Sequence, residues 1–228
     1  MQTVVTPDKR LLTALPYLKK GGCVADIGTD HAYLPIYLVN QGIVSRALAA
    51  DINQGPIDSA RANIAMAGLT KQIDTMQTDG LHGVERFAPD DIMIFGMGGE
   101  LIVKILSEAP WIRREGIGLI LQPMTRAAIL RRWLIENGFS ILGESLSFED
   151  KYYQTVYARF AGTCDTYSEA ELLLGRINIQ TRPPLFEGFL NHEIKVLQAV
   201  IDGKSRSKHA DVTAETRLLD DLKTILKR

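Results

Sequence analysis

The chain has 228 residues, of which 46% are hydrophobic and 23% are charged, and its formal net charge is −1. These values are typical of a globular protein of one or two domains, and they exclude a disordered or fibrous chain. A net charge so close to zero provides no long-range attraction to nucleic acid, so any nucleic-acid function would depend on local basic patches.

No apolar run in the sequence approaches the length of a membrane span. The longest, such as residues 92–95 and 119–121, are far shorter than the roughly 20 residues that a transmembrane helix needs. The first ten residues lack the basic-then-apolar order of a secretion signal, and two cysteines, Cys23 and Cys164, are too few for a disulfide framework. We therefore expect a cytoplasmic protein with no membrane association.

The first 160 residues alternate short apolar runs with amphipathic stretches, which is typical of a parallel sheet with connecting helices. We predict strands near residues 23–28, 47–52, 73–78, 91–96 and 118–122, and helices near 8–20, 33–41, 54–67, 100–108 and 126–136. Gly42, Gly68 and Gly138 each follow a predicted helix, where a left-handed C-terminal cap favours glycine. Two further apolar runs, 139–148 and 153–160, predict a β-hairpin that closes the sheet.

From residue 163 onward the pattern is helical. Pro183 and Pro184 interrupt one helix, and apolar residues then line a helical face between Leu185 and Ile201. A polar, basic turn over 203–208 precedes a last helix, and two such helices with a short connection should pack as an antiparallel pair. We therefore predict a Rossmann-like α/β domain over residues 1–162 and a helical domain over 163–228.

The turn after the first predicted strand is the strongest chemical signal. It has the sequence Asp26-Ile27-Gly28-Thr29-Asp30-His31-Ala32-Tyr33, and such a turn places backbone amides and a helix N-terminus where a nucleotide-like ligand binds. A dinucleotide site needs two more glycines, yet those positions hold Asp30 and Ala32. An acid would repel a pyrophosphate but attract the ammonium and sulfonium groups of S-adenosylmethionine. The turn therefore favours the methyl donor over NAD.

Acidic residues also follow the next two predicted strands. Asp51, in Asp51-Ile52-Asn53, is placed to accept hydrogen bonds from ribose hydroxyls. Asp79 can accept from an adenine amine, while Gly80 leaves room for the ring. Taken singly, each aspartate is better explained by a helix N-cap or a turn. Three acids at the ends of three successive strands together favour a binding site.

The fourth predicted strand runs into Phe95-Gly96-Met97-Gly98-Gly99. Glycines at this point keep the floor of a site open, and Met97 either contacts the donor or substrate or is a core methionine. Enzymes that methylate exocyclic amines commonly have an Asn-Pro-Pro-Tyr type motif here. Its absence argues against such an acceptor.

These motifs resemble those of a known family. The run from Asp26 to Pro35, the Gly96-Met97-Gly98-Gly99 turn and Leu121-Gln122-Pro123 are similar to the bacterial tRNA adenine N1-methyltransferases that modify position 22. The resemblance implies a class I methyltransferase fold, S-adenosylmethionine as the donor, tRNA as the substrate and 1-methyladenosine as the product. It also implies a catalytic role for Asp30, for which a helix N-cap is the alternative.

The remaining site predictions follow from these motifs. The predicted donor-binding residues are Asp26, Gly28, Thr29, His31, Asp51, Ile52, Asn53, Asp79, Gly80, Gly96 and Met97, and the candidate substrate contacts are Tyr33, Gln122, Pro123, Lys204, Arg206 and Lys208. His31 is better explained by packing or capping than by a ligand contact, and Tyr33 either stacks on a flipped base or packs its helix on the sheet. The other histidines, His82, His192 and His209, lack the spacing of metal ligands, so we expect no metal.

Three alternatives stay open on the sequence alone. The chain could methylate another RNA or a small molecule, it could be an RNA- or protein-binding module on a methyltransferase fold, or, less favoured by Asp30 and Ala32, it could be a nicotinamide oxidoreductase. We interpret the basic pairs Lys9-Arg10, Lys19-Lys20, Arg113-Arg114 and Arg131-Arg132 as solvated surface pairs. We expect tRNA as the partner, and the sequence does not decide between a monomer and a weak dimer.

Overall fold

The computed structural model describes residues 7–205 and 211–228. Arg206 and Lys208, two of the candidate substrate contacts, and His209 lie outside the described residues. The chain divides into two compact units, residues 1–165 and 166–228. The predicted domain boundary, after residue 162, lies close to this division.

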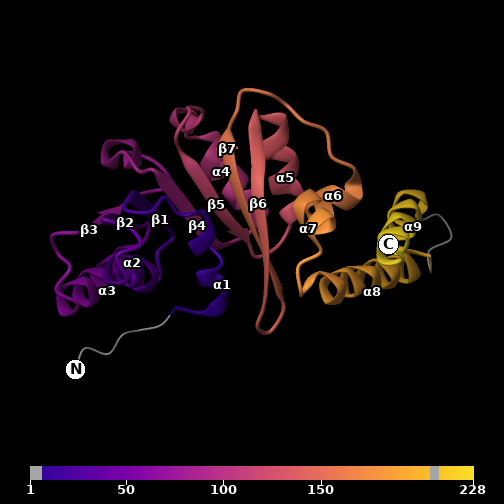
Figure 1. Cartoon of the computed structure of the whole chain (residues 1–228), viewed down its shortest axis with the longest axis horizontal. Helices are drawn as coiled ribbons and strands as arrows, with labels where there is room; N and C mark the ends of the chain where they lie inside the picture. Colours follow the sequence, from indigo (N-terminus) through magenta and orange to yellow (C-terminus); the bar gives the residue numbers. More distant parts are fainter. Residues whose placement is uncertain (1–6, 206–210) are drawn as a thin grey trace. The chain divides into compact units, whose positions relative to one another are not determined.

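The first unit is built on a seven-stranded sheet with the order β3-β2-β1-β4-β5-β7-β6 (Figure 1). The strands are β1 (Cys23–Ile27), β2 (Arg46–Asp51), β3 (Ile73–Gln77), β4 (Asp91–Met97), β5 (Gly118–Pro123), β6 (Phe139–Phe148) and β7 (Tyr152–Phe160). β1 to β5 pair in parallel, and β7 pairs antiparallel with both β5 and β6. The Rossmann-like fold and the closing hairpin are therefore confirmed.

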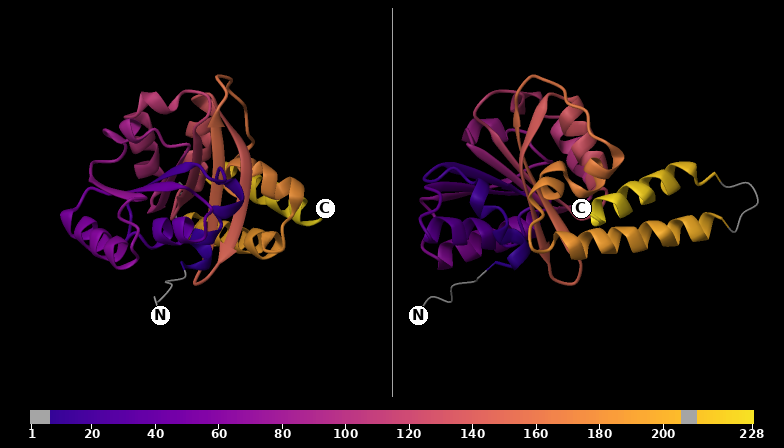
Figure 2. Two further views of the ribbon diagram at one scale, coloured as in Figure 1. Left: turned by 60° about the vertical axis from the view of Figure 1, so that its left-hand side comes forward. Right: turned by 45° about the vertical axis from the view of Figure 1, so that its right-hand side comes forward.

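Helices cover both faces of this sheet, with α2 (Tyr33–Asn40) and α3 (Gln54–Met66) on one face and α4 (Gly99–Ser107) and α5 (Ala127–Glu136) on the other (Figure 2). A parallel sheet covered on both faces needs strands that are apolar almost throughout, as in β5, where every residue is buried. Gly42, Gly68 and Gly138 have φ angles of 65°, 72° and 83°, so each ends its helix as predicted.

The core between the sheet and the α2–α3 layer fixes the strand ends. Strand residues pack there against helix residues, among them Val24, Ala47, Ala49, Met93 and Ile120 from the strands and Leu34, Leu38, Ala60 and Ile64 from the helices. Close packing of this kind leaves little room for movement. The residues at the carboxyl ends of β1, β2 and β4 are therefore held by a rigid base.

The predicted helix over 8–20 is wrong in its extent. α1 covers only Lys9–Leu12, and Leu15–Tyr17 forms a separate 3-10 turn that contains Pro16. Proline has no amide proton, and its ring collides with the carbonyl four residues earlier in a continuing α-helix. The segment before β1 is consequently two short turns rather than one helix.

The interpretation of Arg131-Arg132 as a solvated surface pair is also wrong. The Arg131 side chain, on α5, is 0% exposed, and its Nε donates to Oε1 of Glu144 on β6 at 2.7 Å. A second guanidinium nitrogen donates to Oε1 of Gln154 on β7 at 2.8 Å. This buried ion pair ties α5 to the closing hairpin.

The second unit is helical throughout its described part. Its helices are α6 (Glu169–Leu174), α7 (Arg176–Thr181), α8 (Phe186–Lys204) and α9 (Thr213–Leu226). α6 begins with a capping box between Ser168 and Glu171, and the two prolines separate α7 from α8. α8 and α9 pack side by side as a helical hairpin (Figure 2).

The first two residues of the basic turn predicted over residues 203–208 are helical instead. α8 continues through Gly203 and ends at Lys204. The Lys204 ammonium forms an ion pair with Glu215 at the start of α9. Lys204 therefore has an acidic partner within the unit.

Candidate functional site

A cavity of about 550 Å³ opens at the carboxyl ends of β1, β2 and β4. It is lined by Pro7, Asp8, Arg10, Leu11, Asp26, Gly28, Asp30, Tyr33, Leu34, Asp51, Phe95, Gly96 and Met97. The chain reverses its direction of progress across the sheet between β1 and β4, and ligands of α/β sheets bind at such a switch point. The cavity brings together seven predicted residues: Asp26, Gly28, Asp30, Tyr33, Asp51, Gly96 and Met97.

The turn at Gly28 approaches two neighbouring strands closely. The backbone amides of Gly28 and Thr29 both donate to the carbonyl oxygen of Ala50 on β2, at 2.8 and 2.9 Å. These two amides are therefore engaged with the neighbouring strand. Gly28 has a φ of +77°, and a Cβ there would lie 2.3 Å from Cε of Met97. Glycine is thus required by the backbone conformation and by Met97, which packs on the turn and also lines the cavity.

Asp26 is the most buried acid of the cavity, with 8% of its surface exposed. Thr29 Oγ1 donates to its Oδ2 at 2.8 Å, so Thr29 orients this carboxylate and is not itself a lining residue. Burial chiefly, with smaller contributions from the nearby charges of Asp30 and Asp51, raises the pKa of Asp26 to about 6 against the lowering effect of the Thr29 hydrogen bond. A bound cation would stabilise the ionised form.

Asp30 is not a helix N-cap, which removes the alternative to a functional role that the sequence left open. The N-cap of α2 is Ala32, and no side chain accepts a capping bond there. The Asp30 side chain is 86% exposed, and Nε2 of His31 lies 3.0 Å from its Oδ1. His31 and Ala32 both have a φ of 58°, and Asn63 Nδ2 donates to the His31 carbonyl at 2.9 Å. The strained turn is therefore held in place from α3.

His31 itself lies outside the lining of the cavity. Its ring stacks on Tyr33, with a centroid separation of 5.3 Å, and its Nε2 points to Asp30. It therefore supports two lining residues.

Asp51 ends β2 and faces the cavity. Its Oδ1 accepts a hydrogen bond from the backbone amide of Asn53 at 2.8 Å, which fixes the carboxylate while leaving it further acceptor sites. Ile52 is exposed, its carbonyl accepts from Gln77 Nε2 at 3.1 Å, and Asn53 is the N-cap of α3. The structure does not bring Ile52 or Asn53 to the cavity lining.

Asp79 and Gly80 also lie outside the lining residues. Asp79 is exposed, and its carbonyl accepts from the amide of His82 at 3.3 Å. Gly80 has a φ of +56°, and a Cβ there would lie 3.1 Å from Ile105 on α4. The backbone conformation and the packing of α4 account for glycine at this position.

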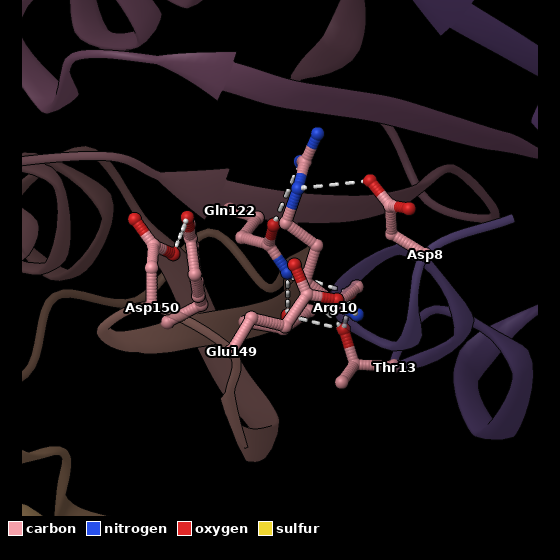
Figure 3. Close-up of polar contacts among 8 residues, drawn as sticks. Asp8, Arg10, Thr13, Gln122, Glu149 and Asp150 are labelled. Atoms are coloured by element: carbon pink, nitrogen blue, oxygen red, sulfur yellow. Dashed lines mark hydrogen bonds and ion pairs between the residues drawn. The ribbon is translucent and has the colours of Figure 1, made fainter.

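Gln122 and Pro123 are buried, and the structure does not bring either of these candidate substrate contacts to the cavity lining. Gln122 is 0% exposed, and its Nε2 donates to the carbonyl of Arg10 at 2.8 Å and to Thr155 Oγ1 at 2.9 Å. Figure 3 shows this contact between the end of β5 and α1. Gln122 therefore anchors the N-terminal segment beside the cavity.

The N-terminal segment is the part of the site that the sequence did not predict. Pro7, Asp8, Arg10 and Leu11 all line the cavity. The interpretation of Arg10 as half of a solvated pair is wrong, because only 23% of its side chain is exposed. The sequence offers one signal, a charged and apolar segment directly before the first strand, which the expected long helix obscures.

Comparisons with known proteins agree with this geometry. A family model described as a methyltransferase domain matches residues 8–156. The tRNA (adenine(22)-N(1))-methyltransferase of Bacillus subtilis is 32% identical over 219 residues, which cover 94% of this chain and 91% of the relative. This chain belongs to the tRNA (adenine(22)-N(1))-methyltransferase family. Residues 8–156 include every cavity-lining residue except Pro7.

Solved structures of this methyltransferase family resemble the chain over nearly its whole length. The B. subtilis tRNA methyltransferase TrmK is 31% identical, with a TM-score of 0.79, over 97% of this chain and 96% of that one. TrmK of M. capricolum, solved with S-adenosylhomocysteine, is 29% identical, with a TM-score of 0.78, over 98% and 97%. The likeness extends across both units.

The described residues were also searched for membrane-spanning helices and for clusters of metal-binding side chains. Within residues 7–205 and 211–228, no helix is long and apolar enough to cross a membrane. The same residues contain no group of three or more His, Cys, Asp or Glu side chains that could hold a metal ion. The prediction that the methyltransferase uses no metal stays a prediction.

Proposed function

We propose that this chain transfers a methyl group from S-adenosylmethionine to N1 of adenine 22 in tRNA. The observation that carries the proposal is the acid-lined cavity at the carboxyl ends of β1, β2 and β4, in a member of the tRNA (adenine(22)-N(1))-methyltransferase family. We further propose that the protein works in the cytoplasm, where its substrate is processed.

The residues of the cavity fit the donor. Asp51, at the end of β2, suits a ribose, because a carboxylate can accept from both hydroxyls. The buried Asp26 suits a cation, since its raised pKa means that its negative charge is poorly compensated by the protein alone. Gly96, where an added Cβ would meet no atom within 4 Å, leaves the cavity open between these acids.

The donor, when bound, supplies a methyl group activated by a sulfonium. The lone pair of adenine N1 attacks this methyl in line, so catalysis depends chiefly on orientation and on exclusion of water. N1 has no proton to lose, and the product is cationic. Asp30 is placed on the cavity to accept a hydrogen bond from the adenine amine and to stabilise the developing positive charge. The contact from His31 restricts the Asp30 carboxylate.

The target adenine must leave any base pair before it can react, because pairing occupies N1. Tyr33 lines the cavity next to Asp30, and its ring is oriented by stacking on His31. We assign Tyr33 the role of a stacking surface for the flipped base.

The helical unit, residues 166–228, is proposed to hold tRNA. It includes Lys204 and the two basic residues that follow, Arg206 and Lys208, while the residues that line the donor cavity all belong to the first unit. Cationic side chains of this kind would contact phosphates rather than bases.

The test is incubation of the protein with unmodified tRNA and methyl-labelled donor, followed by digestion and nucleoside analysis. We expect labelled 1-methyladenosine, and none with a tRNA in which adenine 22 is replaced by guanine. Label in a different nucleoside or in ribosomal RNA would favour another acceptor. Binding of tRNA without transfer would favour a non-catalytic RNA-binding module.

A further inference from the structure

The hairpin of β6 and β7 extends past the paired part of β5 (Figure 1). β7 pairs with β5 over residues 156–159, whereas its pairing with β6 continues to Tyr152, which lies opposite Phe148. Because β7 runs antiparallel to β5, its first residues lie at the edge of the sheet where the parallel strands have their carboxyl ends. The turn of the hairpin is therefore on the same edge of the sheet as the cavity.

The tip of the hairpin, residues 148–152, contacts the wall of the cavity. Glu149 Oε1 accepts a hydrogen bond from the backbone amide of Arg10 at 3.2 Å (Figure 3), and Arg10 lines the cavity. The guanidinium carbon of Arg10 also lies 5.8 Å from the centre of the Tyr153 ring, next to the tip. The tip is thus held beside the cavity by contacts with α1.

The tip presents an aromatic side chain to solvent. Phe148 is 49% exposed, and its ring centroid lies 4.8 Å from that of Tyr152 on the opposite strand, with 56° between the two planes. The contact with Tyr152 restricts the orientation of the Phe148 ring, while half of the residue remains accessible. A large apolar ring in this position favours binding of a partner with an apolar face.

The charges of the tip favour a base over a phosphate. Residues 148–152 contain two acids and one lysine, so an anionic partner gains no net attraction there. The charged groups also have contacts within the same region: Asp150 Oδ1 accepts from the Tyr153 hydroxyl at 2.7 Å, and the Lys151 ammonium lies 5.3 Å from the centre of the Tyr153 ring. Stacking of a nucleic-acid base on an aromatic ring needs no cation, because every base has a π-face.

We propose that Phe148, supported by Tyr152, stacks on the base of a tRNA nucleotide next to the target adenine, an inference that rests on the proposed function. A nucleotide whose neighbour has been flipped into the cavity loses a stacking partner, and an aromatic ring beside the cavity replaces it. Tyr33, inside the cavity, remains the surface for the flipped base itself. A second copy of the chain is the competing partner, but one exposed ring offers far less than the roughly 800 Å² per partner of a stable interface.

Variants of Phe148 separate stacking from packing. Binding of tRNA to the full-length protein would be measured by filter binding with S-adenosylhomocysteine present. We expect Phe148→Ala to weaken tRNA binding at least about fivefold, the lower end of what one stacked base contributes. Phe148→Trp should bind tRNA within about twofold of wild type. Phe148→Leu keeps an apolar side chain against Tyr152 but has no π-face, so it should bind as weakly as Phe148→Ala.

Leu142→Ala is the matched control, because Leu142 is an apolar residue of the same strand, is 54% exposed and lies away from the tip. It should leave tRNA affinity within about twofold of wild type. All four variants should bind S-adenosylhomocysteine with the affinity of wild type, which shows that the cavity is intact.

Two further tRNAs identify the nucleotide. Each has an abasic site on one side of adenine 22, either 5′ or 3′. We expect the wild-type protein to bind one of them at least about fivefold more weakly than intact tRNA, and Phe148→Ala to bind that tRNA and intact tRNA equally. Two groups that contact each other give such non-additive losses.

Four outcomes would overturn the inference. Unchanged tRNA affinity in Phe148→Ala would mean that the tip makes no contact with tRNA. Wild-type affinity in Phe148→Leu would assign the ring to packing, and additive losses with both abasic tRNAs would exclude a neighbour of adenine 22. A wild-type dimer that Phe148→Ala converts to a monomer would assign the tip to a second copy of the chain. All four leave the proposed function standing, which fails only if the wild-type protein does not methylate intact tRNA.

Discussion

The position of Asp26 suits a cationic ligand but is unfavourable for folding, because burial destabilises the ionised carboxylate. Burial raises the pKa of Asp26 from 3.8 to about 6. A carboxyl group whose pKa is raised on folding favours the folded state while protonated, and that contribution is lost as the pH rises through the folded pKa. The free energy of unfolding therefore falls as the pH rises from about 4 to about 6, and above about pH 6 the full cost of the ionised Asp26 is present.

Asp26→Asn should remove this cost. A shift of about two pKa units corresponds to about 3 kcal/mol, so we expect the free energy of unfolding to rise by up to about 3 kcal/mol at pH 7.5 and to match wild type near pH 4. Urea unfolding at both pH values measures this. Asp30→Asn, at an exposed position, should show no comparable pH-dependent gain. A destabilised Asp26→Asn at pH 7.5 would contradict the assignment.

Asp30 is the residue on which the proposed chemistry depends most. Asp30→Asn keeps the shape and removes the charge, and we expect turnover with tRNA to fall at least tenfold, about 1.4 kcal/mol of barrier. The melting temperature should stay unchanged, because Asp30 caps no helix. The affinity for S-adenosylhomocysteine, measured on the same variant, separates a loss of donor binding from a loss of catalysis. Asp79→Asn, an exposed acid outside the cavity lining, is the matched control. Normal turnover in Asp30→Asn would remove the catalytic role.

At the scale of elements, the ion pair between Arg131 and Glu144 joins α5 to β6. Removing one partner leaves a buried charge without its counter-ion, which costs about 3–5 kcal/mol. We expect Glu144→Leu to lower the free energy of unfolding by that amount in urea titrations. The double variant Arg131→Met, Glu144→Leu should be less destabilised than Glu144→Leu alone. Equal stability of the single variant and wild type would show that the pair adds nothing.

The elements also show what a sequence can predict. The parallel strands, their helices and the closing hairpin were predictable because each has its own apolar period and a glycine cap at φ values such as those of Gly42 and Gly68. The extent of α1 was not, because the apolar pattern continues on both sides of Pro16 and hides the break that proline causes. The shared position of Asp26 and Asp51 on the cavity was predictable for a related reason: parallel strands end at one edge, so order along the chain becomes proximity in space.

The unpredicted parts of the site depend on partners distant in sequence. The amides of Gly28 and Thr29 bond to Ala50 on the neighbouring strand, and Gln122 bonds to Arg10, 112 residues away. The buried Arg131 on α5 pairs with Glu144 on β6, 13 residues further along the chain. A local pattern of residue types contains no information on such contacts. For this reason the sequence predicted a substrate contact for Gln122 and a solvent-exposed side chain for Arg131.

At the scale of the whole molecule, the net charge of −1 means that tRNA affinity should depend on where the cations lie. Replacing Lys204, Arg206 and Lys208 together by glutamine should weaken tRNA binding and flatten its salt dependence, by about 0.7–0.9 in the log–log slope for each phosphate that is no longer neutralised. Binding of S-adenosylhomocysteine should be unaffected. Filter-binding titrations over a range of salt concentrations measure the affinity for tRNA and its dependence on salt.

The matched control for this variant removes three other cations of the helical unit, Lys223, Lys227 and Arg228, which are exposed near the end of α9. Equal losses of affinity in the two variants would show that net charge alone matters. An unchanged tRNA affinity in the Lys204, Arg206 and Lys208 variant would exclude these residues from the interface.

The hydrogen bonds from the Gly28 and Thr29 amides to the Ala50 carbonyl have a consequence for inhibitor design. Nucleotide mimics commonly gain affinity by directing a phosphate or sulfonate at the amides of a glycine turn. Here the amides of Gly28 and Thr29 are already engaged, and Asp26 and Asp30 line the cavity. Compounds with a nucleoside and a protonated amine in place of the sulfonium should therefore inhibit this enzyme far better than adenosine phosphates, and should discriminate against the dinucleotide-binding enzymes that share its architecture.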